Sequence, residues 1–415
     1  MKTPRPELAA RRLPVGIALP NAGTHARTLL RAVAAALRTA WLLVGITLAA
    51  LVAAELIGAH WVSPDADAQG ILDPRARADG YAGAPWVDTY FREFAAANHV
   101  EWRPYVYWRR KPFAGRYINI DGRGVRRTWN PAPDGSTPAK RVFVFGGSTM
   151  WGTGARDDHT IASEISRTLA TQRPGEAVEV TNFAEGGYVL TQEVVALLRE
   201  LQQGNVPDLV IFFDGVNDVF ATFQSGAPGT PQNEMNRVRE FNIDVDDRIY
   251  REAAARFVKQ SALYALAGGA AAKGVMWAPP WSASMEELGD RTVDFYASTI
   301  DLVRRLAAAY HFRVLFYWQP VIFTKPHLTP YEQAEADKQS GLADFFTSVY
   351  GKIRQRVSAP DVHHLGDLFA EASAPYFIDF CHLTEQGNEQ LAAAMAPDAA
   401  AALDATAPAA HPTGR

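Results

Sequence analysis

From residue 140 onward, this 415-residue chain alternates short hydrophobic runs with helical patterns, and this alternation restricts the possible folds. Each run is rich in β-branched and aromatic residues, and the segments between the runs repeat apolar residues at helical spacing. Alternation of this kind predicts an α/β three-layer sandwich, in which a mostly parallel sheet carries helices on both faces. The predicted strands are residues 141–145, 177–182, 208–213, 313–318 and 361–365.

Four short motifs in this region carry polar and glycine residues, and three of them stand at the ends of predicted strands. Open parallel sheets bind ligands at the carboxyl ends of their strands, so motifs in these positions are expected to meet. Each motif is weak alone, because glycine-rich turns and Asp-x-x-His pairs are common outside active sites. In chain order the motifs are G-G-S-T-M-W-G at 146–152, N-F-A-E-G-G at 182–187, G-V-N-D at 215–218 and D-F-C-H at 379–382.

Taken together and in this order, the four motifs resemble the blocks of the SGNH hydrolases, also called the GDSL family. The resemblance covers about residues 140–395, and L-T-E-Q-G-N at 383–388 matches the family's usual continuation after the histidine. It implies a flavodoxin-like SGNH sheet and a serine hydrolase that acts on ester bonds without a cofactor or a metal. The usual G-D-S-L departs here to Gly147-Ser148-Thr149, which removes a hydrogen-bonding carboxylate but no catalytic group.

The resemblance implies a catalytic triad of Ser148, Asp379 and His382. Ser148 would attack the ester, His382 would take its proton as general base, and Asp379 would hold the imidazole tautomer. A spacing of three residues lets Asp379 and His382 face the same way in a helical turn or tight loop. An isolated Asp-x-x-His pair is more often a capped helix start, so its place near the end of the domain favours catalysis.

An oxyanion hole is implied by the same resemblance, and its donors are the backbone N–H groups of Ser148 and Gly187 and the side-chain amide of Asn217. Gly187 is chosen over Gly186 because the family's glycine stands five residues after the asparagine of its block, here Asn182. Without the resemblance, the glycine pair is compatible with an ordinary turn and Asn217 with an Asx-turn.

Substrate contacts are expected from Trp151, Trp318 and Gln319, which stand near strand ends on the same edge of the predicted sheet. The alternative for a tryptophan at a strand end is core packing.

Residues 221–282 form an insertion in the catalytic region. Because this insertion leaves the Asn217 motif, it must begin near the site and is a candidate lid or specificity loop; the alternative is a surface elaboration.

A basic tail precedes an apolar run near the N-terminus. Residues 1–38 contain seven Lys or Arg and one Glu, and residues 39–54 contain no charge. A helix over that run spans about 24 Å, slightly less than a hydrocarbon core of about 30 Å, and Arg38 can snorkel to extend it. We expect an uncleaved anchor over 39–61 in the inner membrane, with residues 1–38 in the cytoplasm and the enzyme in the periplasm. A cleaved signal peptide is the alternative.

The flanking segments and the composition are less specific. Residues 62–139 are expected to form a linker and an aromatic, arginine-rich lead-in, for which packing is favoured over glycan or anion binding. Residues 396–415 are mostly Ala, Pro and Thr and are expected to be disordered.

A net charge of −4 does not indicate nucleic-acid binding, and no Cys/His spacing resembles a metal site. Cys381 is the only cysteine, which excludes an internal disulfide and favours a packed thiol.

The predicted function is therefore hydrolysis of a carboxylic ester, with an O-acetyl or short acyl group of a cell-surface or exported glycan as the preferred substrate. Three alternatives remain at this point. The same triad serves an O-acetyltransferase that passes the acyl group to a sugar hydroxyl. A membrane tether also suits a lipid esterase or thioesterase. A non-catalytic glycan-binding or assembly protein is a third alternative, which the presence of every catalytic group disfavours.

Overall fold

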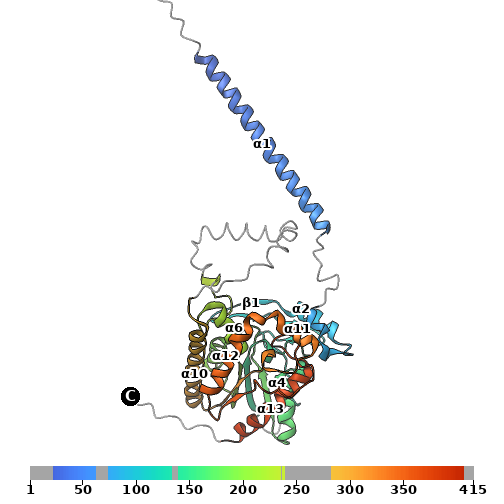
Figure 1. Cartoon of the computed structure of the whole chain (residues 1–415), viewed down its shortest axis with the longest axis vertical. Helices are drawn as coiled ribbons and strands as arrows, with labels where there is room; N and C mark the ends of the chain where they lie inside the picture. Colours follow the sequence, from blue (N-terminus) through green and yellow to red (C-terminus); the bar gives the residue numbers. More distant parts are fainter. Residues whose placement is uncertain (1–21, 62–72, 133–138, 235, 239–281, 406–415) are drawn as a thin grey trace, which may run out of the picture. The chain divides into compact units, whose positions relative to one another are not determined.

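A computed structural model describes residues 22–61, 73–132, 139–234, 236–238 and 282–405 (Figure 1). The chain divides into two compact units. The first comprises residues 1–66 and 250–275, and its described part is the helix α1 (Ala22–Trp61). The second comprises residues 67–249 and 276–415 and contains every other described element. Most of the predicted insertion, residues 239–281, lies outside the described residues.

Helix α1 is 40 residues long and is drawn as one continuous helix in Figure 1. It begins upstream of the predicted anchor, at Ala22, and ends where that anchor was expected to end, at Trp61. Within the candidate span Ala26–Gly58, an 18-residue window has a mean hydropathy of 2.2 and is 0% buried, so the helix is long and apolar enough to cross a membrane. A signal sequence near an N-terminus has the same properties.

Five strands form one parallel sheet, which confirms the predicted fold class. They are β5 (Lys140–Gly146), β6 (Val178–Asn182), β7 (Leu209–Asp214), β8 (Arg313–Trp318) and β9 (Val362–His364), in the spatial order β6-β5-β7-β8-β9. The predicted strands agree with these bounds to within one residue at each end. Their near-continuous apolar sequences follow from burial of both faces of the sheet.

Alternate side chains of each strand enter two separate cores. Val142 and Val144 of β5 belong to the core that also contains residues of α4 (Ile161–Gln172) and α13 (Glu385–Asp404). Phe143 and Phe145 point into the opposite core, because successive residues of a strand face opposite sides. That second core is covered by α5 (Leu190–Gln202), α10 (Met285–Tyr310) and α12 (Ser340–Arg356), which gives the three layers seen in Figure 1.

The end of the catalytic domain corrects one prediction. Residues 396–404 are not disordered, because α13 continues through Pro397 to Asp404. Ala396, Ala399 and Leu403 on this last part are buried, and the contact of α13 with α4 stabilises a helix that composition alone does not predict. Residues 406–415 lie outside the described residues.

Residues of the lead-in segment share a core with the parallel sheet. Tyr90, Phe91 and Phe94 of α2 (Val87–Ala97) are buried in the same core as Val142. The other lead-in elements are η1 (Pro74–Arg77), η2 (Asp79–Tyr81), β1 (Val100–Arg103), β2 (Tyr107–Arg110), β3 (Phe113–Ala114) and β4 (Asn119–Ile120). The remaining short elements are α3 (Ser148–Trp151), η3 (Asp157–His159), α6 (Val216–Ser225), η4 (Ile322–Thr324) and α11 (Pro330–Lys338).

The strand order sets the place of the site. Strand β5 is first in the chain among the sheet strands, and its neighbours β6 and β7 lie on opposite sides of it. The connections that leave β5 and β6 therefore run in opposite directions along the sheet. A crevice opens at the carboxyl ends of the strands where the direction reverses in this way. The motifs that follow β5, β6 and β7 meet at this edge.

Candidate active site

Ser148 is placed by the turn that ends β5. Gly147 precedes α3, and Ser148 is the first residue of that short helix, with a half-buried side chain. A Cβ at Gly147 would lie 2.1 Å from Nδ2 of Asn217. The glycine is therefore required for the Asn217 amide to approach the backbone next to Ser148.

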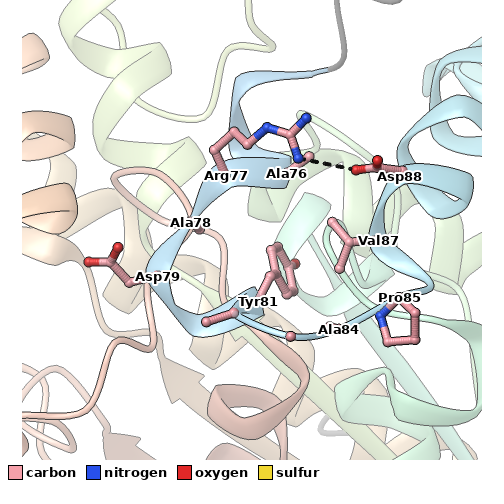
Figure 2. A pocket seen from close by; sticks show the side chains of 11 residues that line it. Ala76, Arg77, Ala78, Asp79, Tyr81, Ala84, Pro85, Val87 and Asp88 are labelled. Atoms are coloured by element: carbon pink, nitrogen blue, oxygen red, sulfur yellow. Dashed lines mark hydrogen bonds and ion pairs between the residues drawn. The ribbon is translucent and has the colours of Figure 1, made fainter.

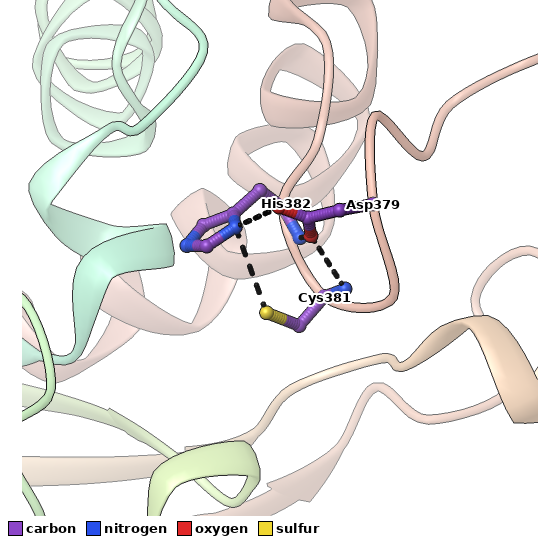
Figure 3. Close-up of side chains that lie close together, drawn as sticks. All are labelled: Asp379, Cys381 and His382. Atoms are coloured by element: carbon purple, nitrogen blue, oxygen red, sulfur yellow. Dashed lines mark hydrogen bonds and ion pairs between the residues drawn. The ribbon is translucent and has the colours of Figure 1, made fainter. Parts of the chain in front are cut away.

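His382 joins Ser148 to Asp379. Its Nε2 lies 2.6 Å from Ser148 Oγ, and its Nδ1 lies 2.6 Å from Asp379 Oδ2. Figure 3 shows the imidazole and the carboxylate facing one another in this loop. With the Nδ1 proton donated to the carboxylate, Nε2 is left to accept the serine proton, which is the arrangement that general-base activation of a nucleophile requires.

A tight loop fixes the positions of Asp379 and His382 relative to each other. The backbone N–H of Ile378 donates to the His382 carbonyl at 3.0 Å, and that of Thr384 donates to the Tyr376 carbonyl at 2.8 Å. The Thr384 side chain then caps α13 by accepting the N–H of Gly387 at 3.2 Å. The sequence spacing of three residues is therefore realised in a loop that directly precedes a helix.

Asp379 is an ionised carboxylate. Burial alone would raise its pKa, but the charge and hydrogen bond of His382 and the charge of Arg75 hold the pKa well below its ordinary value. Its Oδ1 also accepts the backbone N–H groups of Cys381 and His382, at 3.0 and 2.8 Å. The carboxylate is thus fixed from several sides and can stabilise an imidazolium.

Cys381 lies beside this couple without taking the place of Ser148. Its Sγ is 3.7 Å from His382 Nδ1, and the ligand atoms of Asp379, Cys381 and His382 all lie within 4.8 Å of one another (Figure 3). Burial, followed by the negative charge of Asp379, raises the pKa of the thiol well above its ordinary value. A neutral thiol is a poor nucleophile and a poor metal ligand, and His382 Nδ1 is already engaged by the carboxylate.

Three candidate N–H donors belong to residues that follow the ends of β5, β6 and β7. The backbone N–H groups of Ser148 and Gly187 donate to no other group among the described residues. Asn217 Nδ2 donates to the Tyr188 carbonyl at 2.7 Å, and Asn217 Oδ1 accepts from Gln232 Nε2 at 3.2 Å. These two bonds fix the orientation of the amide and leave its second N–H available.

The lead-in segment holds the loop that carries Gly187, and this role was missed in the sequence. Trp108 Nε1 donates to the Gly186 carbonyl at 2.9 Å. Arg110 forms a buried ion pair with Glu185 at 2.6 Å, and the Arg110 backbone N–H donates to the same carboxylate at 2.8 Å. The signal in the sequence was the pairing of an arginine-rich segment with the lone Glu of N-F-A-E-G-G.

The described start of the predicted insertion also reaches the site. Besides its bond to Asn217, Gln232 has Oε1 3.3 Å from the position that a Cβ of Gly187 would occupy. The Gln232 carbonyl accepts from Arg237 Nη1 at 2.6 Å, and the Arg237 guanidinium lies 4.9 Å from the Trp108 ring centre. The insertion therefore begins over the proposed oxyanion donors.

The predicted substrate contacts are corrected by the structure. Trp151 is 0% exposed and lies between the guanidinium groups of Arg110 and Arg126, at 3.8 and 4.2 Å from its ring. Trp318 is 2% exposed and packs in the core under α10. These rings have no free face for a sugar, so the alternative of core packing applies. Gln319 is also buried, and its Nε2 lies 3.4 Å from Thr149 Oγ1.

A cavity of about 540 Å³ lies on the lead-in segment and is shown in Figure 2. Residues between 76 and 88 line it, and Ser148, Asn217 and His382 do not. An exposed ion pair between Arg77 and Asp88, at 3.4 Å, is its main polar feature (Figure 2). The cavity is therefore separate from the arrangement around Ser148.

Comparison with known proteins adds a family match. Residues 142–395 match the family described as GDSL-like Lipase/Acylhydrolase. No curated protein matches the chain.

Several solved structures resemble the chain. An acetyl xylan esterase, AlAXEase, is 16% identical, with 61% of this chain and 97% of that chain covered and a TM-score of 0.34. A lipase from a goat rumen metagenome is 14% identical, with coverages of 64% and 99% and a TM-score of 0.37. An acetylxylan esterase from Geobacillus stearothermophilus is 13% identical, with coverages of 62% and 93% and a TM-score of 0.34.

Proposed function

The chain belongs to the GDSL-like lipase/acylhydrolase (SGNH) family and is an ester-hydrolysing enzyme, and from this premise we propose that Ser148, His382 and Asp379 are its catalytic triad. The observation that carries the proposal is the pair of 2.6 Å contacts from the two nitrogens of His382 to Ser148 Oγ and Asp379 Oδ2. The residues come from motifs 234 positions apart in the chain, so local sequence structure does not account for their meeting.

In the proposed reaction, Ser148 Oγ attacks the carbonyl carbon of the ester while its proton passes to His382 Nε2. The carbonyl oxygen becomes an oxyanion, which the N–H groups of Ser148, Gly187 and Asn217 stabilise. The C–O bond to the alcohol then breaks, and the alcohol leaves with the proton from His382. Water, activated by the same imidazole, attacks the acyl-enzyme and releases the carboxylic acid and free Ser148.

The proposed substrate is an O-acetyl or other short acyl ester on a cell-surface or exported glycan. Close packing beside Gly187 supports the short acyl group: among the described residues, Gln232 Oε1 and the ring edge of Trp108 lie 3.3 and 3.4 Å from the position that a Cβ of Gly187 would occupy. A long acyl chain would require an apolar groove to bury it. The half-buried Ser148 and His382 side chains are accessible to a group that projects from a larger polymer.

The proposed location is the periplasmic face of the inner membrane, with α1 as an uncleaved single-pass anchor. The basic residues before the apolar run support a cytoplasmic N-terminus. An enzyme held in this way meets exported polymers rather than cytoplasmic metabolites, which agrees with a glycan ester as substrate.

Covalent labelling followed by an ester panel tests the proposal. A fluorophosphonate should label the full chain in detergent. The label should be lost in Ser148→Ala but kept in the control Ser163→Ala, because Ser163 is a buried serine outside the proposed triad. Turnover should be highest with acetyl esters and should fall as the acyl chain lengthens. A preference for long acyl chains would favour a lipid esterase, and acyl transfer to an added sugar would favour an O-acetyltransferase. Unchanged labelling of Ser148→Ala would refute the nucleophile.

A further inference from the structure

The carboxylate of the proposed triad has a charged neighbour from outside the family segment. Arg75 belongs to η1 of the lead-in, whereas the family match begins at residue 142. Its Nη1 lies 3.4 Å from Asp379 Oδ2, across 304 positions of sequence. Asp379 Oδ2 is also the oxygen that lies 2.6 Å from His382 Nδ1. One carboxylate oxygen is therefore shared by an imidazole and a guanidinium.

Arg75 is held in place on two sides. Asp73 contacts it twice, with Oδ1 2.9 Å from Arg75 Nε and Oδ2 2.7 Å from Nη2. Asp73 Oδ1 also accepts the backbone N–H of Arg75 at 3.0 Å and so caps η1. The guanidinium lies 5.1 and 5.7 Å from the ring centres of Phe94 and Phe91 of α2. A bidentate pair and two rings leave Arg75 little freedom to swing away from Asp379.

We propose that Arg75 and Asp73 are positioning residues of the catalytic site. The Arg75 cation offsets part of the negative charge of Asp379. The Asp73 carboxylate reduces this offset, because it also pairs with Arg75. The inference rests on the proposed function, because it concerns how the triad base works. It makes the segment that follows α1 part of the active site and not only a spacer.

The two residues should act on His382 in opposite directions. A cation next to Asp379 weakens the field that stabilises a protonated imidazole, so loss of Arg75 makes His382 more basic. Loss of the Asp73 charge leaves the guanidinium unbalanced and makes His382 less basic. Loss of both charges restores the original net charge and should leave the basicity of His382 close to that of the unaltered protein.

Other titratable groups around the couple are neutral or paired in the described part of the chain. Burial raises the pKa values of the Tyr81, Tyr90, Tyr331 and Cys381 side chains, so these groups stay protonated near neutral pH. Glu385, at the start of α13, forms an ion pair with Arg156 at 2.7 Å. The Arg75–Asp73 pair is thus the charge pair in direct contact with Asp379.

The test is the pH dependence of kcat/KM for an acetyl ester, measured on the full chain in detergent. The acid limb of this profile reports the pKa of the free-enzyme base. We expect Arg75→Gln to move the limb upward and Asp73→Asn to move it downward, each by about half to one pH unit. The double variant should return to within about 0.2 units of the parent, on the same charge argument.

Matched controls come from a neighbouring ion pair, between Arg77 of η1 and Asp88 of α2. Arg77→Gln and Asp88→Asn remove the same charges from an exposed pair that does not contact Asp379, and neither should move the limb. Circular dichroism checks folding, and if Arg75→Gln does not fold, Asp73→Asn still tests the downward shift. If both variants fold, the acid limb moves in neither of them and Ser148→Ala stays inactive, the inference is overturned. Activity in Ser148→Ala would instead overturn the proposed function.

Discussion

At the scale of single residues, Gly147 shows how closely the proposed oxyanion donors are packed. Any side chain at this position would collide with the amide of Asn217. That amide is held by the Tyr188 carbonyl and by Gln232, so it has no alternative orientation that keeps both bonds. Ser148 and the proposed donor Asn217 are therefore positioned together, although they follow different strands.

The first prediction concerns the nucleophile and the base. Ser148→Ala and His382→Ala should each lower kcat for an acetyl ester by about 10³-fold or more, and the double variant should be little worse, because triad members act as a unit. Steady-state kinetics on the folded variants measures this. Turnover above about one tenth of the parent in Ser148→Ala would be incompatible with the assigned roles.

A second prediction concerns the oxyanion donors. Asn217→Ala should lower kcat by ~10²–10³ with a smaller effect on KM, because the amide meets charge that develops in the transition state. Gln232→Ala should lower kcat less, since Gln232 orients the amide but does not meet the oxyanion. An effect of Asn217→Ala on KM alone would identify Asn217 as a binding residue.

At the scale of elements, α5, β7 and α10 meet around buried acids behind the site. Glu193 of α5 and Asp214 of β7 are both buried, and the Tyr296 hydroxyl of α10 donates to Asp214 Oδ2 at 3.0 Å. Burial, followed by the charges of neighbouring carboxylates, raises the pKa values of Glu193 and Asp214 well above their ordinary range. Burial also raises the pKa of Asp218, beside Asn217, to about 6.

These raised pKa values predict a stability that falls with pH. The folded chain binds protons that the unfolded chain releases above about pH 4, so stability is greatest in acid and is lost as pH rises through the folded-state pKa values. Glu193→Gln keeps the size of the side chain but removes one titrating group. Its free energy of unfolding should fall less steeply between about pH 5 and 8, by up to ~1.4 kcal/mol per pH unit.

Denaturant unfolding at several pH values measures this slope. Glu179→Gln is the control, because Glu179 lies on the exposed side of β6 and should leave the slope unchanged. A slope for Glu193→Gln equal to that of the parent would show that Glu193 does not bind a proton on folding.

At the scale of the whole molecule, the proposed location rests on the basic tail and α1. Seven Lys or Arg precede the apolar run, and residues 55–74 contain none. The positive-inside rule therefore favours a cytoplasmic N-terminus and a translocated catalytic domain.

A reporter that is active only outside the cytoplasm, fused after Arg415, should work, and a cytoplasmic reporter at the same place should be silent. The protein should also stay with membranes after a carbonate wash. An active cytoplasmic reporter would reverse the orientation and remove the argument for an exported glycan. Release by the wash, with the outward orientation kept, would indicate a cleaved signal peptide.

The sequence by itself determined the strands and the motifs that follow them. A strand buried on both faces must be apolar at nearly every position, so β5, β7 and β8 are visible as local patterns. The carboxyl ends of parallel strands share one edge, so Ser148 and Asn217 were predicted to meet without knowledge of any side-chain contact.

Tertiary structure alone decided what surrounds these residues. Trp151 and Trp318 stand at the predicted edge, but their burial depends on arginines and helices from distant segments. Helix α13 extends past Pro397 because its last residues pack against the core, and Arg75 reaches Asp379 across 304 positions. Contacts of this kind depend on which surfaces remain uncovered after the layers assemble, and no local pattern of residues encodes that.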